Sequence, residues 1–297
     1  MSGHGLDEAA LRALVAEVVR EVVKSVEAPR PSSPRGKAVQ TPAVDPVQRG
    51  PRHRPLPPPR SAEDLEALKE ATPARIAQGR TGTRYLTDSY LGLRADHAIA
   101  LDAVESQVPD GWPEAQGWLP LRSRAKDHAE YLLHPDLGRR LDDASRARCE
   151  KEADKGVDIQ VIAGDGLSAA ALLENGPPLV QALVRALPQA GFRVGRPLFV
   201  RHARIGVQDD IGVLTGAKAT VILVGERPGL GTGDSLSIYT AYAPRLGQDN
   251  AEKDCISNVR ELGFLPARAA EQCAELMRRT FAAGGGGVRL AQTPGAR

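Results

Sequence analysis

Three loops of this 297-residue chain lie where an α/β protein could bind a ligand. Each follows an apolar, strand-like segment, and the loops read GDGLS (164–168), RHARIGVQDD (201–210) and GERPGLGTGDS (225–235). Open α/β sheets bind ligands beyond the carboxyl ends of their strands, where such loops and helix N-termini converge. We therefore expect these three loops to form the functional site.

The third loop has the glycine content of a phosphate-binding loop, but its spacing does not match one. Counted from Gly229 and Gly231, the dinucleotide fingerprint GxGxxG requires a glycine where Asp234 stands, and no GK[ST] follows to complete a Walker A loop. A generic glycine-rich turn is therefore favoured. The alternative is a stand-alone α/β protein that binds a nucleotide or another phosphate ligand through residues 225–235.

Glu226 ends an apolar strand-like segment and is followed by Arg227 and Pro228. One interpretation is an ion pair, with Arg227 or another arginine, that caps the rim of the sheet. The other is a carboxylate that accepts hydrogen bonds from the amide or hydroxyl groups of a ligand. The position of Glu226 in the sequence leaves both interpretations open.

The histidines do not form a catalytic or metal-binding pattern. His97 shares a predicted helical face with Tyr90 and Leu101, which favours a packed histidine over a catalytic base. Three further histidines lack the HxxH or HExxH spacing of metal ligands, namely His128, His134 and His202. We therefore expect no metal site.

The carboxylates and cysteines do not indicate catalysis either. Asp142–Asp143 and Asp209–Asp210 are adjacent pairs, whose side chains point in different directions and mark solvated helix starts. Cys255 has no motif histidine nearby, so a thiol nucleophile is not expected. The residues therefore describe a ligand- or partner-binding α/β body without catalytic residues of its own.

Segments typical of strands alternate with segments typical of helices after about residue 116. The strand-like segments are VDIQVIAG (157–164), PLFVRHARI (197–205), ATVILVGE (219–226) and LSIYTAYAP (236–244), the last being a strand or a strand–helix junction. Strands separated by helices pair in parallel through right-handed crossovers. We predict an α/β fold with a doubly wound parallel sheet in residues 116–297.

Residues 1–115 are predicted to form three further parts. An amphipathic helix is expected over Asp7–Glu27, within residues 1–28, because leucine and valine recur there at three- and four-residue steps. The proline-rich residues 29–60 predict a flexible linker, and residues 61–115 a small helical subdomain. In that subdomain a helix from about Asp88 to Val108 has an apolar face made of Tyr90, Leu91, Ala98, Leu101, Val104 and Val108.

The apolar stripe of the helix in residues 1–28 needs a surface against which it can be buried. Two interpretations remain open. The helix could self-associate or dock on the body of this chain, or it could be an address peptide that inserts into another assembly, as in cargo proteins of bacterial microcompartments.

Composition excludes several classes of function. The 39 basic and 37 acidic residues nearly balance at a net charge of +2, and only 4% of residues are aromatic, so a nucleic-acid partner is not expected. Three widely spaced cysteines without a CxxC pair predict neither a disulfide framework nor a zinc knuckle. No apolar run approaches the roughly 20 residues that span a bilayer. We expect a soluble, cytoplasmic protein without a membrane partner.

A set of sequence blocks is similar, in order, to one protein family. The blocks are ARIAQGRTGTR, LRADHAIALDAV, PDLGRRL, VDIQVIAGDGLS, FVRHARI, DDIGVLTGAKATVILVGERPGL, YTAYAPR and CISNVR, and they cover most of residues 74–260. Together they resemble the ethanolamine ammonia-lyase small (light) subunit, and VGERPGL and CISN are the most unusual of them. Residues 1–60 resemble the family only in general character.

The resemblance implies an activity, a cofactor and a partner. Ethanolamine ammonia-lyase converts ethanolamine into acetaldehyde and ammonia with adenosylcobalamin. The family's large subunit is a TIM barrel that holds the substrate and most of the radical chemistry, so the small subunit is expected to be inactive alone. The resemblance also implies a helical N-terminal subdomain followed by a Rossmann-like domain, with the cofactor between the two chains. A location inside a bacterial microcompartment is a further expectation.

The family's cofactor contacts carry over onto three residues of this chain. They are Ile205 in FVRHARI, Glu226 in VGERPG and Cys255 in CISN. Ile205 would offer apolar surface to the corrin, Glu226 would accept its amide N–H groups, and Cys255 would be a small, soft contact. The family often has valine in place of Ile205, a change that a main-chain contact would survive. None of the three is expected to be catalytic.

Overall fold

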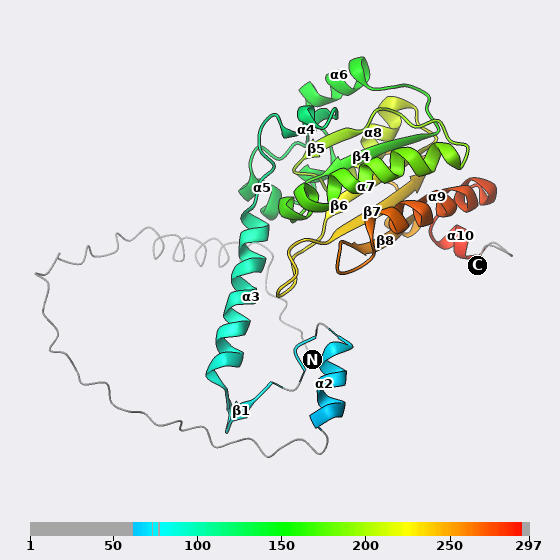
Figure 1. Ribbon diagram of the computed structural model, residues 1–297. Helices are drawn as coiled ribbons and strands as arrows, with labels where there is room; N and C mark the ends of the chain where they lie inside the picture. Colours follow the sequence, from blue (N-terminus) through cyan, green and yellow to red (C-terminus); the bar gives the residue numbers. More distant parts are fainter. Residues whose placement is uncertain (1–61, 73, 77, 293–297) are drawn as a thin grey trace, which may run out of the picture. The chain divides into compact units, whose positions relative to one another are not determined.

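The structure, a computed structural model, describes residues 62–292 except 73 and 77 (Figure 1). All of these residues belong to the unit Leu56–Arg297. The helix predicted in residues 1–28 and the linker predicted at 29–60 lie outside the described residues. Helices and strands alternate along the described part, which confirms the α/β class predicted from the sequence.

A six-stranded sheet forms the centre of this part. The strands, in sheet order, are β3 (Leu119–Arg122), β5 (Leu198–Arg201), β4 (Ile159–Gly164), β6 (Ala219–Gly225), β7 (Leu236–Tyr242) and β8 (Lys253–Val259). The first four are parallel to one another, as predicted. Every residue of β4 and β6 is buried, in agreement with their continuous runs of apolar and β-branched residues.

The prediction of a wholly parallel sheet is wrong at one edge. Strand β7 runs antiparallel to β6, and β8 runs antiparallel to β7. The ten residues 226–235 that join β6 to β7 contain no helix, and a parallel connection needs a crossover of about a dozen residues or more. The chain therefore turns back on itself at this edge of the sheet.

Helices pack on both faces of the sheet. On one face α7 (Ala169–Gln189) and α9 (Pro266–Ala283) bury alternate residues of β4 and β6, and on the other face α6 (Asp143–Glu152) and α8 (Val207–Thr215) bury the intervening ones. Figure 1 shows α7 and α8 on opposite sides of the sheet. We call this sheet and its four helices the α/β body.

The order of the parallel strands creates a switch point at β4. The chain passes from β4 through α7 to β5 on one side, and then from β5 through α8 to β6 on the other side of β4. The loops after β4 and β5 lead to helices on opposite faces of the sheet and therefore diverge, which leaves a crevice at the carboxyl ends of these strands.

Smaller elements surround the body. They are α2 (Ala62–Glu70), the hairpin of β1 (Arg80–Thr81) and β2 (Arg84–Tyr85), α3 (Thr87–Glu105), α4 (Trp112–Ala115), α5 (His128–Leu133), η1 (Leu137–Arg139), η2 (Asn250–Glu252) and α10 (Val288–Gln292). The turn of the hairpin contains Gly82, whose φ of 60° favours glycine.

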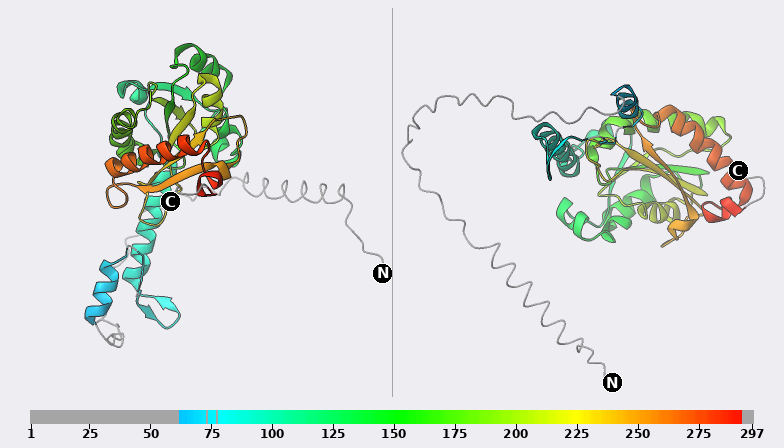
Figure 2. Two further views of the ribbon diagram at one scale, coloured as in Figure 1. Left: turned by 90° about the vertical axis from the view of Figure 1, so that its right-hand side faces the viewer. Right: turned by 90° about the horizontal axis from the view of Figure 1, so that it is seen from below.

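Helix α3 differs from expectation in the surface that it buries. Tyr90, Leu91 and Leu101 of its predicted apolar face are 46%, 56% and 50% exposed, and His97 is exposed rather than packed. The reason is that only the carboxyl end of α3 meets the body, where Ala103 is buried and the Ser106 hydroxyl accepts a 3.0 Å hydrogen bond from the N–H of Ala170. Figure 2 shows the rest of α3 extending away from the sheet.

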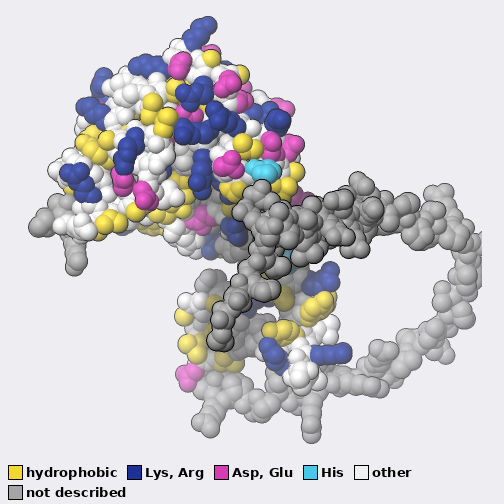
Figure 3. Space-filling model, turned by 180° about the vertical axis from the view of Figure 1, so that it is seen from behind, with side chains coloured by type: hydrophobic (Ala, Val, Ile, Leu, Met, Phe, Trp, Pro, Cys, Tyr) yellow, Lys and Arg dark blue, Asp and Glu magenta, His cyan; other side chains and the backbone are white. Residues whose placement is uncertain are grey.

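The surface shows no separation of charge on the face drawn in Figure 3. There, Lys and Arg side chains are interspersed with Asp and Glu side chains over the α/β body. This agrees with the net charge of +2. Within the described residues, no helix is both long and apolar enough to cross a membrane.

Candidate functional site

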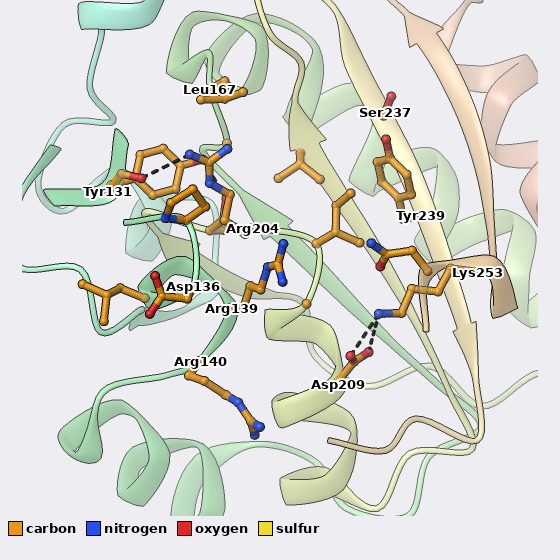
Figure 4. Close-up of a pocket in the computed structure, with 18 of the residues that line it drawn as sticks. Tyr131, Asp136, Arg139, Arg140, Leu167, Arg204, Asp209, Ser237, Tyr239 and Lys253 are labelled. Carbon is orange, nitrogen blue, oxygen red and sulfur yellow. Dashed lines mark hydrogen bonds and ion pairs between the residues drawn. The ribbon is translucent and has the colours of Figure 1, made fainter. Parts of the chain in front are cut away.

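A cavity of about 930 Å³ opens at the carboxyl ends of the parallel strands. Its lining comes from the loops after β4 and β5, the end of β6, strands β7 and β8, and the segments around η1 and η2 (Figure 4). The cavity therefore lies at the switch point of the sheet. Its volume is at the upper end of the range for small-molecule sites, about 300–1,000 Å³.

The structure brings the three predicted site residues to this end of the sheet. Ile205 and Glu226 line the cavity directly. Cys255 does not line it, but its Sγ lies 4.0 Å from the hydroxyl of Ser237, and on β8 it pairs with Tyr239. Ser237 and Tyr239 both line the cavity, so Cys255 is exposed beside its wall.

Three donors of the chain hold the Glu226 carboxylate. The hydroxyl of Ser235 donates to Oε2 at 2.7 Å, and Oε1 accepts from the hydroxyl of Ser237 and, at 3.2 Å, from the N–H of Asn258. Burial opposes ionisation of Glu226, but these hydrogen bonds outweigh it and lower the pKa of Glu226 below its ordinary value. The carboxylate is therefore ionised and fixed in orientation at neutral pH.

The structure disfavours the ion pair of the first interpretation. Arg227 is exposed, and no ion pair joins Glu226 to it or to another arginine in the described part of the chain; the charge of Arg260 adds to the three hydrogen bonds in lowering the pKa of Glu226. A carboxylate has about four lone-pair sites, of which Ser235, Ser237 and Asn258 occupy three. One site on Oε2 remains, so Glu226 can accept a further hydrogen bond from a ligand.

The serines that position Glu226 were not predicted from the sequence. Ser235 and Ser237 are two residues apart at the start of β7, so both side chains point to the same face. The pattern S-x-S at the start of a strand places two hydroxyl groups on one face. It indicates a partner for Glu226 only once this strand is known to run antiparallel to the one that ends at Glu226.

The carboxylate of the loop GDGLS supports the neighbouring loop. Asp165 is buried, and its two oxygens accept hydrogen bonds from the N–H groups of His202 at 2.8 Å and Ala203 at 3.0 Å. Burial raises the pKa of Asp165, while these two bonds oppose the rise. They hold His202 at a φ of 57° and so place Ile205 in the cavity wall.

Gly166 in the same loop allows a close approach between two chain segments. Its φ is 62°, and a Cβ at this position would lie 2.4 Å from the carbonyl oxygen of Gly225. No side chain fits there. Glycine is therefore needed for the loops after β4 and β6 to meet beside the cavity.

Asp209 and Asp210 lie at a helix start, as predicted, but they are buried and not solvated. The Nζ of Lys253 lies 2.9 Å from both carboxylate oxygens of Asp209, and both side chains are almost fully buried. Asp210 accepts a 3.0 Å hydrogen bond from the N–H of Leu141 and forms an ion pair with Arg146. The cations come from β8 and α6, which the spacing of the aspartates does not reveal.

The glycine-rich loop at 225–235 does not form a phosphate cradle. Gly229 and Thr232 bond to each other through their main chains, at 3.0 and 3.1 Å. A Cβ on Gly231 would lie 3.3 Å from the carboxylate carbon of Asp96, so the loop packs closely against α3. The geometry therefore disfavours the nucleotide- or phosphate-binding alternative.

Among the described residues, no group of three or more His, Cys, Asp or Glu side chains could hold a metal ion. The cavity offers the ionised Glu226 carboxylate, apolar surface from Leu167, Ile205 and Val224, and several basic side chains. Three further carboxylates also line it, those of Asp136, Asp209 and Asp249. Fold and cavity together define an α/β protein with a candidate ligand site at the carboxyl ends of its parallel strands.

Comparison with family models identifies the family. The model of the ethanolamine ammonia-lyase light chain (EutC) matches residues 62–291, which is most of the chain. The chain therefore belongs to the ethanolamine ammonia-lyase light chain family, as its sequence blocks indicated. Membership makes it a subunit of a lyase of ethanolamine catabolism, with a large subunit as its partner.

Proposed function

We propose that this chain holds one side of adenosylcobalamin in the cavity at the switch point of a Rossmann-like domain, against the large, TIM-barrel subunit of ethanolamine ammonia-lyase. The observation that carries the proposal is the Glu226 carboxylate, which is ionised, fixed by three donors, and left with one free acceptor site. The proposed site residues are Ile205, Glu226 and Cys255.

The lining fits a corrin. A corrin is a broad, largely apolar disc fringed by primary amides, so it needs apolar surface and acceptors for amide N–H groups. Ile205, Leu167 and Val224 offer the first, and Glu226 offers the second. When bound, the cofactor supplies the radical through its cobalt–carbon bond. The residues of this chain bind it, orient it and exclude water from one side.

Two features support a site that a second chain completes. The cavity is open, so a disc-shaped ligand in it would keep one face uncovered. Helix α3 also exposes Tyr90, Leu91, Ile99 and Leu101, and exposed apolar surface of this kind marks sites of protein–protein contact. We propose that the large subunit covers the open side of the cofactor and holds the substrate, and that this chain is inactive alone.

Co-expression with the large subunit tests the proposal by activity and by a second, independent reading. Ethanolamine deamination is expected only when both chains and adenosylcobalamin are present.

The second reading is the chemical labelling of Cys255. Cys255 is exposed, whereas Cys149 and Cys273 are buried, and burial raises the pKa of their thiols to about 11 and about 12. A maleimide should therefore label Cys255 alone, and the cofactor should slow that labelling in the assembled complex.

The control is a Cys255→Ser chain, which should take up almost no label while folded. Equal labelling rates of the complex with and without adenosylcobalamin would place the cofactor away from β8 and would contradict the proposed site. Deamination by either chain alone would contradict the division of labour between the subunits.

For the remainder of the chain we propose an amphipathic helix at 1–28, a linker at 29–60, a helical subdomain at 61–115 and the Rossmann-like domain at 116–297. The family match begins at residue 62, which supports a boundary near residue 61. The helix at 1–28 is proposed as an address for a bacterial microcompartment shell or its cargo.

Deletion of residues 1–60 is expected to leave the folding of the body and the deaminase activity of the two-chain complex within about twofold of the parent, because few contacts are expected to cross a linker. Solubility or localisation should change instead. Thermal unfolding, deaminase assay and localisation of a fluorescent fusion measure this. A truncated chain that no longer pairs with the large subunit would move the boundary.

A further inference from the structure

Arginine side chains gather on one wall of the cavity. Arg124, Arg139 and Arg204 line it, and none of the three forms an ion pair in the described part of the chain. One carboxylate, Asp136, lies on the same wall, and no ion pair joins it to them. The wall therefore presents uncompensated positive charge to whatever fills the cavity.

The chain holds Arg204 in place. Its guanidinium lies over the ring of Tyr131, 4.3 Å from the centroid, and Nη2 donates to the carbonyl oxygen of Tyr131 at 3.1 Å. Its main-chain N–H donates to Gly138 at 2.8 Å, and a Cβ on Gly138 would clash with Arg204 Cγ at 2.6 Å. The Nε atom is buried without a partner among the described residues. Such a donor is expected to be satisfied by a ligand or by water.

Arg139 is positioned by the turn η1 and by the absence of a side chain at Gly206. A Cβ on Gly206 would lie 3.1 Å from both Cβ and Cγ of Arg139, so the arginine stem lies directly on this glycine. Unlike Arg204, Arg139 has an exposed side chain with no hydrogen bond in the described structure. Its guanidinium can therefore bind a ligand without breaking a hydrogen bond within the described structure.

The opposite wall of the cavity presents a hydrogen-bond acceptor, Glu226, in place of the arginine donors. In Figure 4, Arg139 and Arg204 project into the view from one side, and Ser237 and Tyr239 lie on the other. Ser237 donates to the ionised Glu226, so that side is an acceptor surface. A ligand that is neutral with amide donors at one end and anionic at the other would enter in one orientation.

We propose that Arg139 and Arg204 form an anion subsite for the phosphodiester of the cofactor's nucleotide tail. This inference rests on the proposed function. The side-chain amides of the corrin are neutral, and the phosphodiester is the negative group of the molecule. Guanidinium groups recognise phosphate oxygens through charge-assisted, often bidentate hydrogen bonds. The tail therefore lies against the turn η1, and the corrin amides face Glu226.

The test compares three ligands on the assembled two-chain complex by equilibrium binding, followed through the visible absorbance of the corrinoid. Adenosylcobalamin carries the phosphodiester and the base, adenosylcobinamide phosphate carries a phosphate without the base, and adenosylcobinamide carries neither. The variant Arg139→Met is expected to bind the two phosphate-bearing ligands about tenfold more weakly and adenosylcobinamide unchanged. Arg139→Lys should recover part of the loss.

Two further variants sharpen the test. Arg185→Met on α7 removes another exposed arginine, one that does not line the cavity, and should change no affinity. Gly206→Ala keeps the charge of Arg139 but displaces its stem, and should weaken the same two ligands by a smaller factor. Equal losses for adenosylcobinamide, or no loss for any ligand, would overturn the anion subsite. A parent complex that binds none of the three corrinoids would instead overturn the proposed function, and the subsite with it.

Discussion

Replacement of Lys253 by methionine is expected to lower the free energy of unfolding by about 3–5 kcal/mol, because it leaves the buried carboxylate of Asp209 without a cation. The Nζ of Lys253 lies 2.9 Å from both oxygens of Asp209, and the two side chains are 2% and 4% exposed. Urea unfolding of the parent and variant chains measures the difference.

A surface pair in the same chain gives a matched control. The Nζ of Lys218 also lies 2.9 Å from an aspartate, Asp158, but the lysine side chain is 64% exposed. Lys218→Met is therefore expected to cost less than about 1 kcal/mol. The double variant Lys253→Met with Asp209→Asn removes the stranded charge and should recover part of the stability. Equal losses of stability for Lys253→Met and Lys218→Met would show that the burial of the Lys253–Asp209 pair does not determine the effect.

The loss should also depend on pH. Burial raises the pKa of Asp209, and Lys253 opposes that rise. Without Lys253 the folded-state pKa rises further above the unfolded-state value of about 4. A raised carboxyl pKa favours the folded state below the ordinary value and loses that contribution as pH rises through the folded-state pKa. The deficit of Lys253→Met should therefore be largest at neutral pH and shrink as pH falls.

Replacement of Glu226 by glutamine is expected to weaken adenosylcobalamin binding to the two-chain complex about tenfold or more. A hydrogen bond to a charged group contributes about 1.5–3 kcal/mol, and glutamine replaces one acceptor oxygen by a donor NH₂ group. The variant also disturbs the bonds from Ser235 and Ser237, so the free acceptor site loses its fixed orientation. The concentration of cofactor that gives half-maximal activity should rise, with little change in the maximal rate.

Direct cofactor titration and thermal unfolding separate the binding role of Glu226 from a structural one. Glu261→Gln, at an exposed position without a hydrogen bond in the described structure, removes the same charge as a control. Ser235→Ala should weaken binding by less than Glu226→Gln, because Ser237 and Asn258 still hold the carboxylate. Lost stability with unchanged cofactor affinity would show that Glu226 only joins the start of β7 to the end of β6.

The parts of the fold that depend on local sequence were predicted correctly. Strands β4 and β6 are recognisable in the sequence as continuous apolar and β-branched runs, because a central parallel strand is buried on both faces. The crevice beyond them follows from topology, so the sequence was enough to predict that the loops carrying Ile205 and Glu226 lie at one edge of the sheet.

The predictions from sequence failed, or were not made, where contacts with distant segments determine the local structure. Strand β8 buries only Lys253, Ile256 and Val259, without the alternation typical of a strand, so its sequence did not distinguish it from a loop. The direction of β7 depends on whether a helix forms in residues 226–235, a segment whose glycines fit several turns. The exposure of α3 reflects how little of the body it meets, which its regular apolar spacing cannot express.

What the sequence by itself determined is the family, the α/β class and the end of the sheet at which ligands bind, because these follow from ordered motifs and from the periodicity of apolar residues. Only the tertiary structure decided the state of the charged groups. Asp209 meets Lys253 across 44 positions of the chain, Glu226 meets Asn258 across 32, and Arg204 meets Tyr131 across 73. The charge, the orientation and the remaining hydrogen-bonding capacity of a polar group are set by neighbours within a few ångströms. Folding brings those neighbours together from segments that are far apart in the chain.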